Sequence, residues 1–142
     1  MDFASINWLG VVLCVVVNFV VGSIWYHPKT FYDTWRKAQN LPETRTPGGV
    51  NMGLVWGLTA VGALILAIAM AFVVKTIGGL MPGGVSLGNG ALVGFMMWLG
   101  FIAPAYLVNN LFAGRGFKVW AIEVGNYLVN FLLFGAILGL LH

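Results

Sequence analysis

The sequence contains very little charge. Only 8% of its 142 residues are charged and 60% are hydrophobic, whereas an average soluble domain has about 25% charged residues. Seven Lys and Arg and four Asp and Glu are too few to give a domain of this size a polar surface. This shortage excludes a soluble globular protein and indicates that the surplus apolar side chains face a lipid bilayer.

Cysteine and the common catalytic motifs are also scarce. The single cysteine, Cys14, lies within an apolar run, so it cannot form an intramolecular disulfide and we expect a buried, unreactive thiol. The chain has no phosphate-binding glycine loop with its lysine, no serine nucleophile elbow, no His-Glu zinc helix and no haem-attachment spacing. We therefore expect no enzyme activity, no cofactor and no metal. The few basic residues form no stripe that would bind nucleic acid.

Four apolar runs are each long enough to cross a bilayer as a helix, which takes about 20 residues for a hydrocarbon core of about 30 Å. An open sheet in lipid would leave its edge hydrogen bonds unsatisfied, whereas a helix satisfies its own. The first run is too long for a signal peptide, so we expect it to remain as a span. The pattern predicts an all-α integral membrane protein, a compact bundle of four transmembrane helices in a single domain over residues 1–142. The predicted spans are residues 6–26, 51–74, 91–112 and 119–141.

The connection after the first span, residues 27–49, is the one sizeable polar region. Pro28 ends the preceding helix, because proline pushes the residue before it out of the helical region. Within the connection Phe31, Trp35 and Ala38 recur at helical spacing opposite charged residues. This pattern is typical of a short helix that lies in the membrane interface. We expect it to act either as a simple anchor or as a gate or lipid-sensing element.

Six of the seven basic residues lie in the first and third connections. They are Lys29, Arg36, Lys37, Arg45, Arg115 and Lys118, and Lys75 alone lies on the opposite side. Because connections rich in Lys and Arg remain in the cytoplasm, we expect residues 27–49 and 113–118 to be cytoplasmic and both termini to lie outside, in a bacterial inner membrane. The residues expected to anchor the interface are Trp25, Tyr26, Trp35, Trp120 and Arg115.

Glu123 is the only acidic residue within a predicted span, and burying an unpaired charge there costs about 2.5 kcal/mol or more. Asn126, Tyr127 and Asn130 follow three, four and seven positions later, so all four share one face of the last helix. Polar residues at a matching depth on other spans are Asn18, Asn109 and Asn110. Either this face lines a polar cavity or ion path, or Glu123 pairs with Arg115 and the asparagines hold neighbouring helices together.

Three pairs of glycines are spaced four residues apart, as in helices that approach each other closely. The pairs are Gly53 with Gly57, Gly90 with Gly94, and Gly135 with Gly139. The second span also has a face of small residues, made by Thr59, Ala63, Ala67 and Ala71. We expect these positions to allow tight packing, either within one chain or between subunits.

Two groups of residues, taken in order, resemble a known family. The first is Asn7-Trp8, Gly22, Trp25-Tyr26, Pro28, Phe31 and Trp35. The second is Trp98-Leu99-Gly100-Phe101, Pro104, Asn109-Asn110, Leu111-Phe112, Gly114-Arg115 and Gly135-Ala136-Ile137-Leu138-Gly139. The chain resembles the small bacterial membrane proteins of domain-of-unknown-function family 1761. The resemblance implies a compact four-helix membrane protein and no catalytic residues. One departure is Ala113, where the family has an acidic residue, so a shared charge pair at this turn is not implied.

The polar face around Glu123 favours a small transporter or channel-like protein. Four short spans enclose little room, so we expect such a protein to be a homo-oligomer. The alternative is a structural or accessory subunit, whose polar face and glycine pairs pack against a membrane-protein partner. A membrane enzyme acting on lipids has only the aromatic and basic segment 27–49 in its favour.

Overall fold

The computed structural model describes residues 2–43, 49 and 51–142, and all regular structure in this part of the chain is helical. After a short 3-10 turn at Phe3–Ser5, the elements are α1 (Trp8–Trp25), α2 (Tyr32–Ala38), α3 (Met52–Leu80), α4 (Leu87–Met97), a π-helical segment (Trp98–Ile102), α5 (Ala103–Phe112) and α6 (Gly116–Leu140). Four stretches are long and apolar enough to span a membrane: α1, α3, the continuous run from α4 to α5, and α6. The predicted all-α membrane bundle with four spans is confirmed.

The observed helices differ from the predicted spans mainly at their ends. α3 continues past Lys75 and ends at Leu80, because a lysine near a helix end can remain at the surface. Three helix starts are fixed by side chains that accept hydrogen bonds from backbone N–H groups of the first turn. These caps are Asn7 on α1, Asn51 on α3 and Ser86 on α4.

Within the predicted interfacial segment 27–49, the helix α2 covers only Tyr32–Ala38. It packs against the bundle, since the rings of Trp35 and Tyr26 meet edge to face with their centroids 6.0 Å apart. Arg45, one of the basic residues of this segment, lies outside the described residues.

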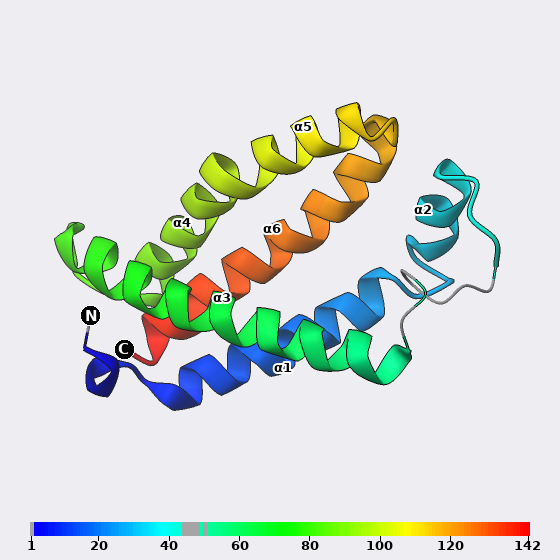
Figure 1. Cartoon of the computed structure of the whole chain (residues 1–142). Helices are drawn as coiled ribbons and strands as arrows, with labels where there is room; N and C mark the ends of the chain where they lie inside the picture. The colour runs from blue at the N-terminus through cyan, green and yellow to red at the C-terminus, as the bar shows by residue number, and fades with distance from the viewer. Residues whose placement is uncertain (1, 44–48, 50) are drawn as a thin grey trace.

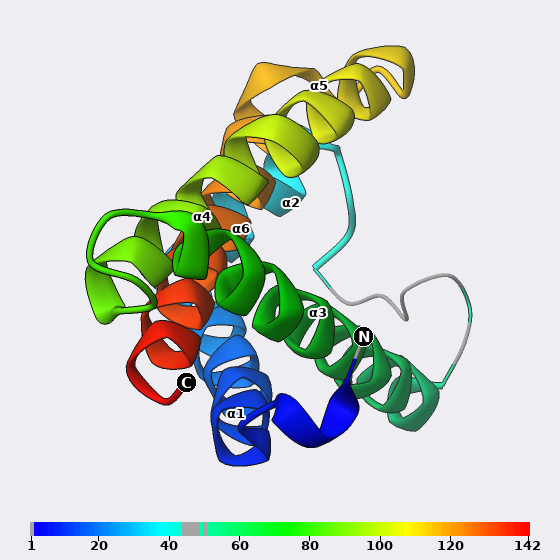
Figure 2. The ribbon, with the colours of Figure 1, turned by 90° about the vertical axis from the view of Figure 1, so that its left-hand side faces the viewer.

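Both termini lie at one end of the bundle and α2 lies at the other (Figure 1). We call these the terminal end and the α2 end. The last helix, α6, is central, because it contacts α1, α2, α3, α4 and α5. Figure 2, which looks onto the terminal end, shows α3 and α5 leading away from each other.

The main apolar core lies in the half of the bundle next to the terminal end. It joins the start of α1, the later part of α3 and the end of α6, and it includes the fully buried Val11, Ala67 and Phe134. Cys14 is buried in this core, as predicted. By contrast, none of residues 52–62 at the start of α3 is buried. This part of α3 is only loosely packed, with the ring of Trp56 5.9 Å from that of Phe19 on α1.

Two of the predicted glycine pairs form one seam, which we call the glycine seam, between α4 and α6. A side chain at Gly90 would overlap the carbonyl oxygen of Gly135, and one at Gly94 would overlap that of Phe131. A side chain at Gly139 would likewise overlap a carbonyl oxygen at the start of α4. The two backbones therefore touch directly, which only glycine permits.

The third glycine pair makes no such contact. Nothing lies within 4 Å of a side chain built at Gly57, and Gly53 meets only the cap of its own helix. The small-residue face on the same helix divides at this point, with Thr59 exposed and Ala63, Ala67 and Ala71 buried. The part of α3 near the α2 end thus presents Gly53 and Gly57 outward.

The third span changes its helical geometry halfway. The π-helical segment Trp98–Ile102 lies just before Pro104, whose nitrogen has no hydrogen to donate to the preceding turn. Figure 1 shows α5 turning away from the line of α4 at this place.

Candidate functional site

Glu123 lies near the α2 end of α6 and is only 8% exposed. Its Oε1 accepts a hydrogen bond from Trp35 Nε1 at 3.1 Å and lies 3.5 Å from Arg115 Nη1. Its Oε2 accepts from Asn110 Nδ2 at 3.0 Å. Both carboxylate oxygens therefore have partners, which come from α2, from α5 and from the turn before α6. We call these four residues the Glu123 cluster.

The geometry of the Glu123 cluster matches the pairing of Glu123 with Arg115 that the sequence allowed. A cation at Oε1 would have to compete with Trp35 and Arg115, and one at Oε2 with Asn110, so in this structure the carboxylate joins α2, α5 and the turn before α6. Of the two neighbouring asparagines, only Asn110 reaches the cluster, while Asn109 is exposed. The glutamate that first suggested an ion path is thus part of the scaffold at the α2 end.

Tryptophans reinforce the same turn of α6, residues 122–124. Their indole N–H groups bond from Trp25 to the Ile122 carbonyl at 2.8 Å, from Trp35 to the Glu123 carboxylate at 3.1 Å, and from Trp98 to the Val124 carbonyl at 2.8 Å. Trp120 itself donates to the Ala103 carbonyl at 2.9 Å. Three of the four aromatic residues predicted as interfacial anchors, Trp25, Trp35 and Trp120, therefore also tie one element to another.

The next turns of α6 hold the remaining polar residues of this face. Tyr127 accepts a hydrogen bond from Tyr106 at 2.9 Å, which leaves its own O–H free to donate. Asn130 donates to the Asn126 carbonyl at 3.0 Å and contacts its side-chain oxygen at 3.3 Å. Asn126 Nδ2 is buried and has no hydrogen-bond partner among the described residues, an uncommon state for a buried donor.

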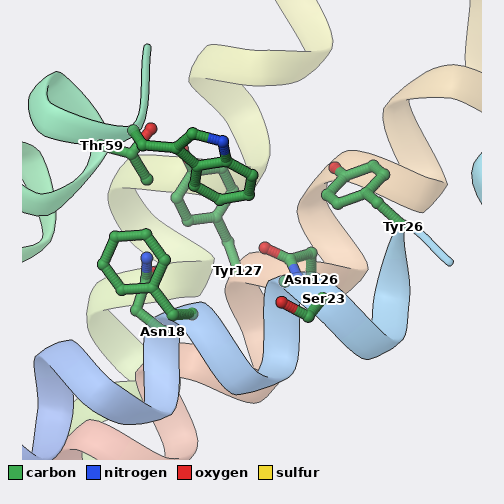
Figure 3. Close-up of a pocket in the computed structure, with 9 residues that line it drawn as sticks. Asn18, Ser23, Tyr26, Thr59, Asn126 and Tyr127 are labelled. Carbon is green, nitrogen blue, oxygen red and sulfur yellow. The ribbon is translucent and has the colours of Figure 1, made fainter. Parts of the chain in front are cut away.

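A cavity of about 320 Å³ lies beside these residues, between α1, α3 and α6. We call it the Asn126 cavity. Its polar walls are Asn18, Ser23 and Tyr26 from the α1 side, Thr59 from α3, and Asn126 and Tyr127 from α6, and its apolar walls are Phe19, Gly22 and Trp56. Figure 3 shows these side chains from three helices gathered around one space. Asn18 thus lines the same cavity as Asn126 and Tyr127, whereas Glu123 does not line it.

The depth of the Asn126 cavity follows from the helices that form it. Asn18 lies close to the middle of α1 (Trp8–Trp25), and Asn126 lies close to the middle of α6 (Gly116–Leu140). The exposed Ser23, Trp56 and Thr59 lie nearer the α2 end. Toward the terminal end the apolar core follows directly, so the cavity is closed on that side.

The cavity offers neutral hydrogen-bonding groups and aromatic rings. Its lining contains no charged side chain, and among the described residues no group of three or more His, Cys, Asp or Glu could hold a metal ion. Amides and hydroxyls arranged in this way suit an uncharged molecule that has hydroxyl or amide groups of its own. The volume is within the range of about 300–1,000 Å³ that is usual for small-molecule sites.

A comparison with family profiles finds one that matches residues 9–139, described as a protein of unknown function, DUF1761. The chain belongs to this family. The DUF1761 match confirms the resemblance seen in the sequence and covers all four spans almost completely. Neither the comparison with curated proteins nor that with solved structures finds a match.

Several residues that line the cavity of this DUF1761 protein could not be selected from the sequence. Ser23, Trp56 and Phe19 line the cavity but look like ordinary members of apolar runs. Thr59 was grouped with a small-residue packing face, whereas the structure places its side chain on the cavity wall. One available signal was depth, because a polar Thr59 on the second span falls at a level similar to that of Tyr127 on the fourth.

Proposed function

We propose that this protein is a small membrane transporter that binds an uncharged polar solute in the Asn126 cavity. The observation that supports it best is the cavity itself, a space of about 320 Å³ with six polar side chains, of which Asn18 and Asn126 lie close to the middle of their helices. Substrate sites near the bilayer midplane are typical of transporters.

The shape of the bundle supports a transport cycle with two states. The cavity is bordered by exposed residues toward the α2 end, and the apolar core closes it toward the terminal end. Release at the terminal end would require the contacts of α1 and α3 in that core to separate. The glycine seam would keep α4 and α6 together while they do so.

Gly22 provides a direct test of the proposal. Nothing lies within 4 Å of a side chain built at this position, although Gly22 lines the cavity. Gly22→Val should therefore fill part of the cavity without displacing its neighbours. Gly57→Val is the matched control, because this position is equally free of neighbours but does not line the cavity.

The measurement is solute uptake by liposomes that contain the purified protein, followed by light scattering. The probes are urea, glycerol, ribitol and glucose, which are uncharged and increase in size. We expect at least one of them to enter faster than into protein-free liposomes, with the excess reduced at least severalfold by Gly22→Val and unchanged by Gly57→Val. Uptake equal to that of empty liposomes, or equal in the two variants, would contradict the proposal.

The orientation in the membrane is part of the proposal. The described basic residues at the α2 end are Lys29, Arg36, Lys37, Arg115 and Lys118, against Lys75 near the terminal end. This bias supports a cytoplasmic α2 end and external termini in a bacterial inner membrane. Labelling of single cysteines introduced at Lys118 and Lys75, in the Cys14→Ala background, tests it. A membrane-impermeant reagent applied to intact cells should reach position 75 only.

The second candidate function is that of an accessory subunit, and a specific observation favours it. None of residues 52–62 of α3 is buried in the described chain, and Gly53 and Gly57 face outward. Such a face suits a neighbouring helix, from a second copy or from another membrane protein. Purification in mild detergent separates these cases. A homo-oligomer of fixed size without other proteins would argue against the accessory role.

A further inference from the structure

A second hollow surface lies on the other half of α3, near the terminal end. It consists of two adjoining grooves that share Phe72 and Val73 as walls. One groove, of about 710 Å³, is also lined by Asp2, Ser5, Lys75, Thr76 and Ile77, and the other, of about 350 Å³, by Phe3, Ile65, Ile68 and Ala69. The first therefore carries charged and polar groups beside apolar ones, and the second is apolar. This continuous surface is called the α3 groove below.

The 3-10 turn Phe3–Ser5 forms the side wall of the α3 groove. Phe3 packs edge to face on Phe72 with ring centroids 5.2 Å apart. Lys75 Nζ donates to the Ser5 carbonyl at 2.9 Å, which holds the ammonium beside the turn and leaves two of its protons free. Asp2 caps the same turn, because its Oδ1 accepts from Ala4 N at 3.0 Å.

The length of the α3 groove matches one leaflet of a bilayer. Ile65 lies next to the midpoint of α3 (Met52–Leu80), and Lys75 lies ten residues further along. A helix rises about 1.5 Å per residue, so the two are about 15 Å apart along the axis. This is half of a hydrocarbon core of about 30 Å. The apolar part of the groove therefore lies at the depth of acyl chains and the charged part at the depth of headgroups.

We propose that the α3 groove binds one phospholipid with a zwitterionic headgroup. The phosphate accepts hydrogen bonds from Lys75, and the ammonium of the headgroup pairs with the exposed carboxylate of Asp2. An acyl chain lies along Ile65, Ile68 and Ala69. Among the described residues the groove carries one charge of each sign, Asp2 and Lys75, which complements a zwitterion. An anionic lipid would meet Asp2 as a like charge.

The test compares two lipids that have the same oleoyl chains, phosphatidylethanolamine and phosphatidylglycerol. Protein with a C-terminal tag, so that Asp2 keeps its surroundings, is incubated with each lipid and analysed by native mass spectrometry. We expect one phosphatidylethanolamine to be retained per chain, in preference to phosphatidylglycerol. Equal retention of the two lipids by the wild-type protein, or a preference for phosphatidylglycerol, would overturn the proposal.

Variants assign the lipid to the groove. Lys75→Gln should weaken phosphatidylethanolamine retention roughly two- to fivefold, the range expected for an exposed ion pair. Asp2→Asn, which lies outside the spans, should remove the preference between the lipids. Lys118→Gln at the α2 end is the matched control and should change nothing. Retention that is the same in Lys75→Gln, Asp2→Asn and the wild type would exclude this site, whatever the uptake assay shows for the Asn126 cavity.

Discussion

The two halves of the bundle are held together by different kinds of contact. Next to the terminal end, apolar side chains form a core and two backbones touch along the glycine seam. Next to the α2 end, the buried groups include Glu123, Asn110 and Asn126, and the first residues of α3 are not buried at all. Hydrogen bonds hold the second half, whereas close contact holds the first. The half that leaves room for a ligand is the half held by polar groups.

The largest effect is expected from a change in the tightly packed half. Gly94→Ala would place a methyl group on the Phe131 carbonyl oxygen, and because backbone cannot move aside cheaply, we expect a loss of about 3 kcal/mol of stability. Gly57→Ala, which meets nothing within 4 Å, should be neutral. Thermal unfolding in detergent micelles compares the two. Equal melting temperatures would show that the seam is not a close contact.

The next effect belongs to the polar half. Glu123→Ala removes the acceptor of Trp35 and Asn110 and the partner of Arg115. Hydrogen bonds to a charged group are worth about 1.5–3 kcal/mol, and since the Arg115 side chain is 39% exposed we expect the lower part of that range, about 2 kcal/mol. Glu43→Ala, on an exposed carboxylate, serves as the control. A Glu123→Ala protein as stable as this control would exclude a holding role for the cluster.

A smaller effect should follow from one indole bond. Trp25→Phe keeps an aromatic ring but loses the N–H that donates to the Ile122 carbonyl, so we expect a loss of about 1 kcal/mol. Trp56→Phe, on a ring that is 52% exposed, should cost less. Chemical denaturation of both variants in the same detergent measures the difference. A loss of unfolding free energy in Trp25→Phe no larger than that in Trp56→Phe would argue against a stabilising role for the hydrogen bond from Trp25 to the Ile122 carbonyl.

The smallest effect on stability is expected at the cavity. Gly22→Val adds side-chain atoms where none lie within 4 Å, so its melting temperature should stay within the error of the wild type. The same variant is expected to impair uptake, which would separate function from folding. A large loss of stability would instead mean that the Asn126 cavity is smaller than described.

Much of this fold could be predicted from the sequence because a bilayer restricts which segments can cross it. A span needs length and apolar character, and both can be read locally, so the four spans were found with errors only at their ends. The shared face of Glu123, Asn126 and Tyr127 was also predicted, since it depends only on the helical repeat. The sequence did not predict that this face is divided between the Glu123 cluster and the Asn126 cavity. Trp35 lies 88 positions from Glu123, and no local pattern shows that α2 reaches one end of the face while α1 and α3 enclose the other.

The glycine pairs also show that local spacing does not determine which helices come into contact. All three have the same spacing, yet only those on α4 and α6 meet, and Gly53 with Gly57 faces outward. Spacing establishes that a helix can be approached closely. Which helix approaches it depends on connections and tilts that arise only when the whole chain packs.

The glycine seam has a consequence for how this bundle responds to genetic change. A glycine has no side-chain freedom to lose on packing, so the contact between α4 and α6 requires no rotamer to be selected on either helix. The same close contact leaves no space for a side chain, because every possible substitution at Gly90 or Gly94 adds atoms against a carbonyl oxygen. Exposed apolar positions such as Leu58 and Val61 can exchange one lipid-facing side chain for another. In this bundle, tolerance of substitution is therefore lowest where side chains are absent.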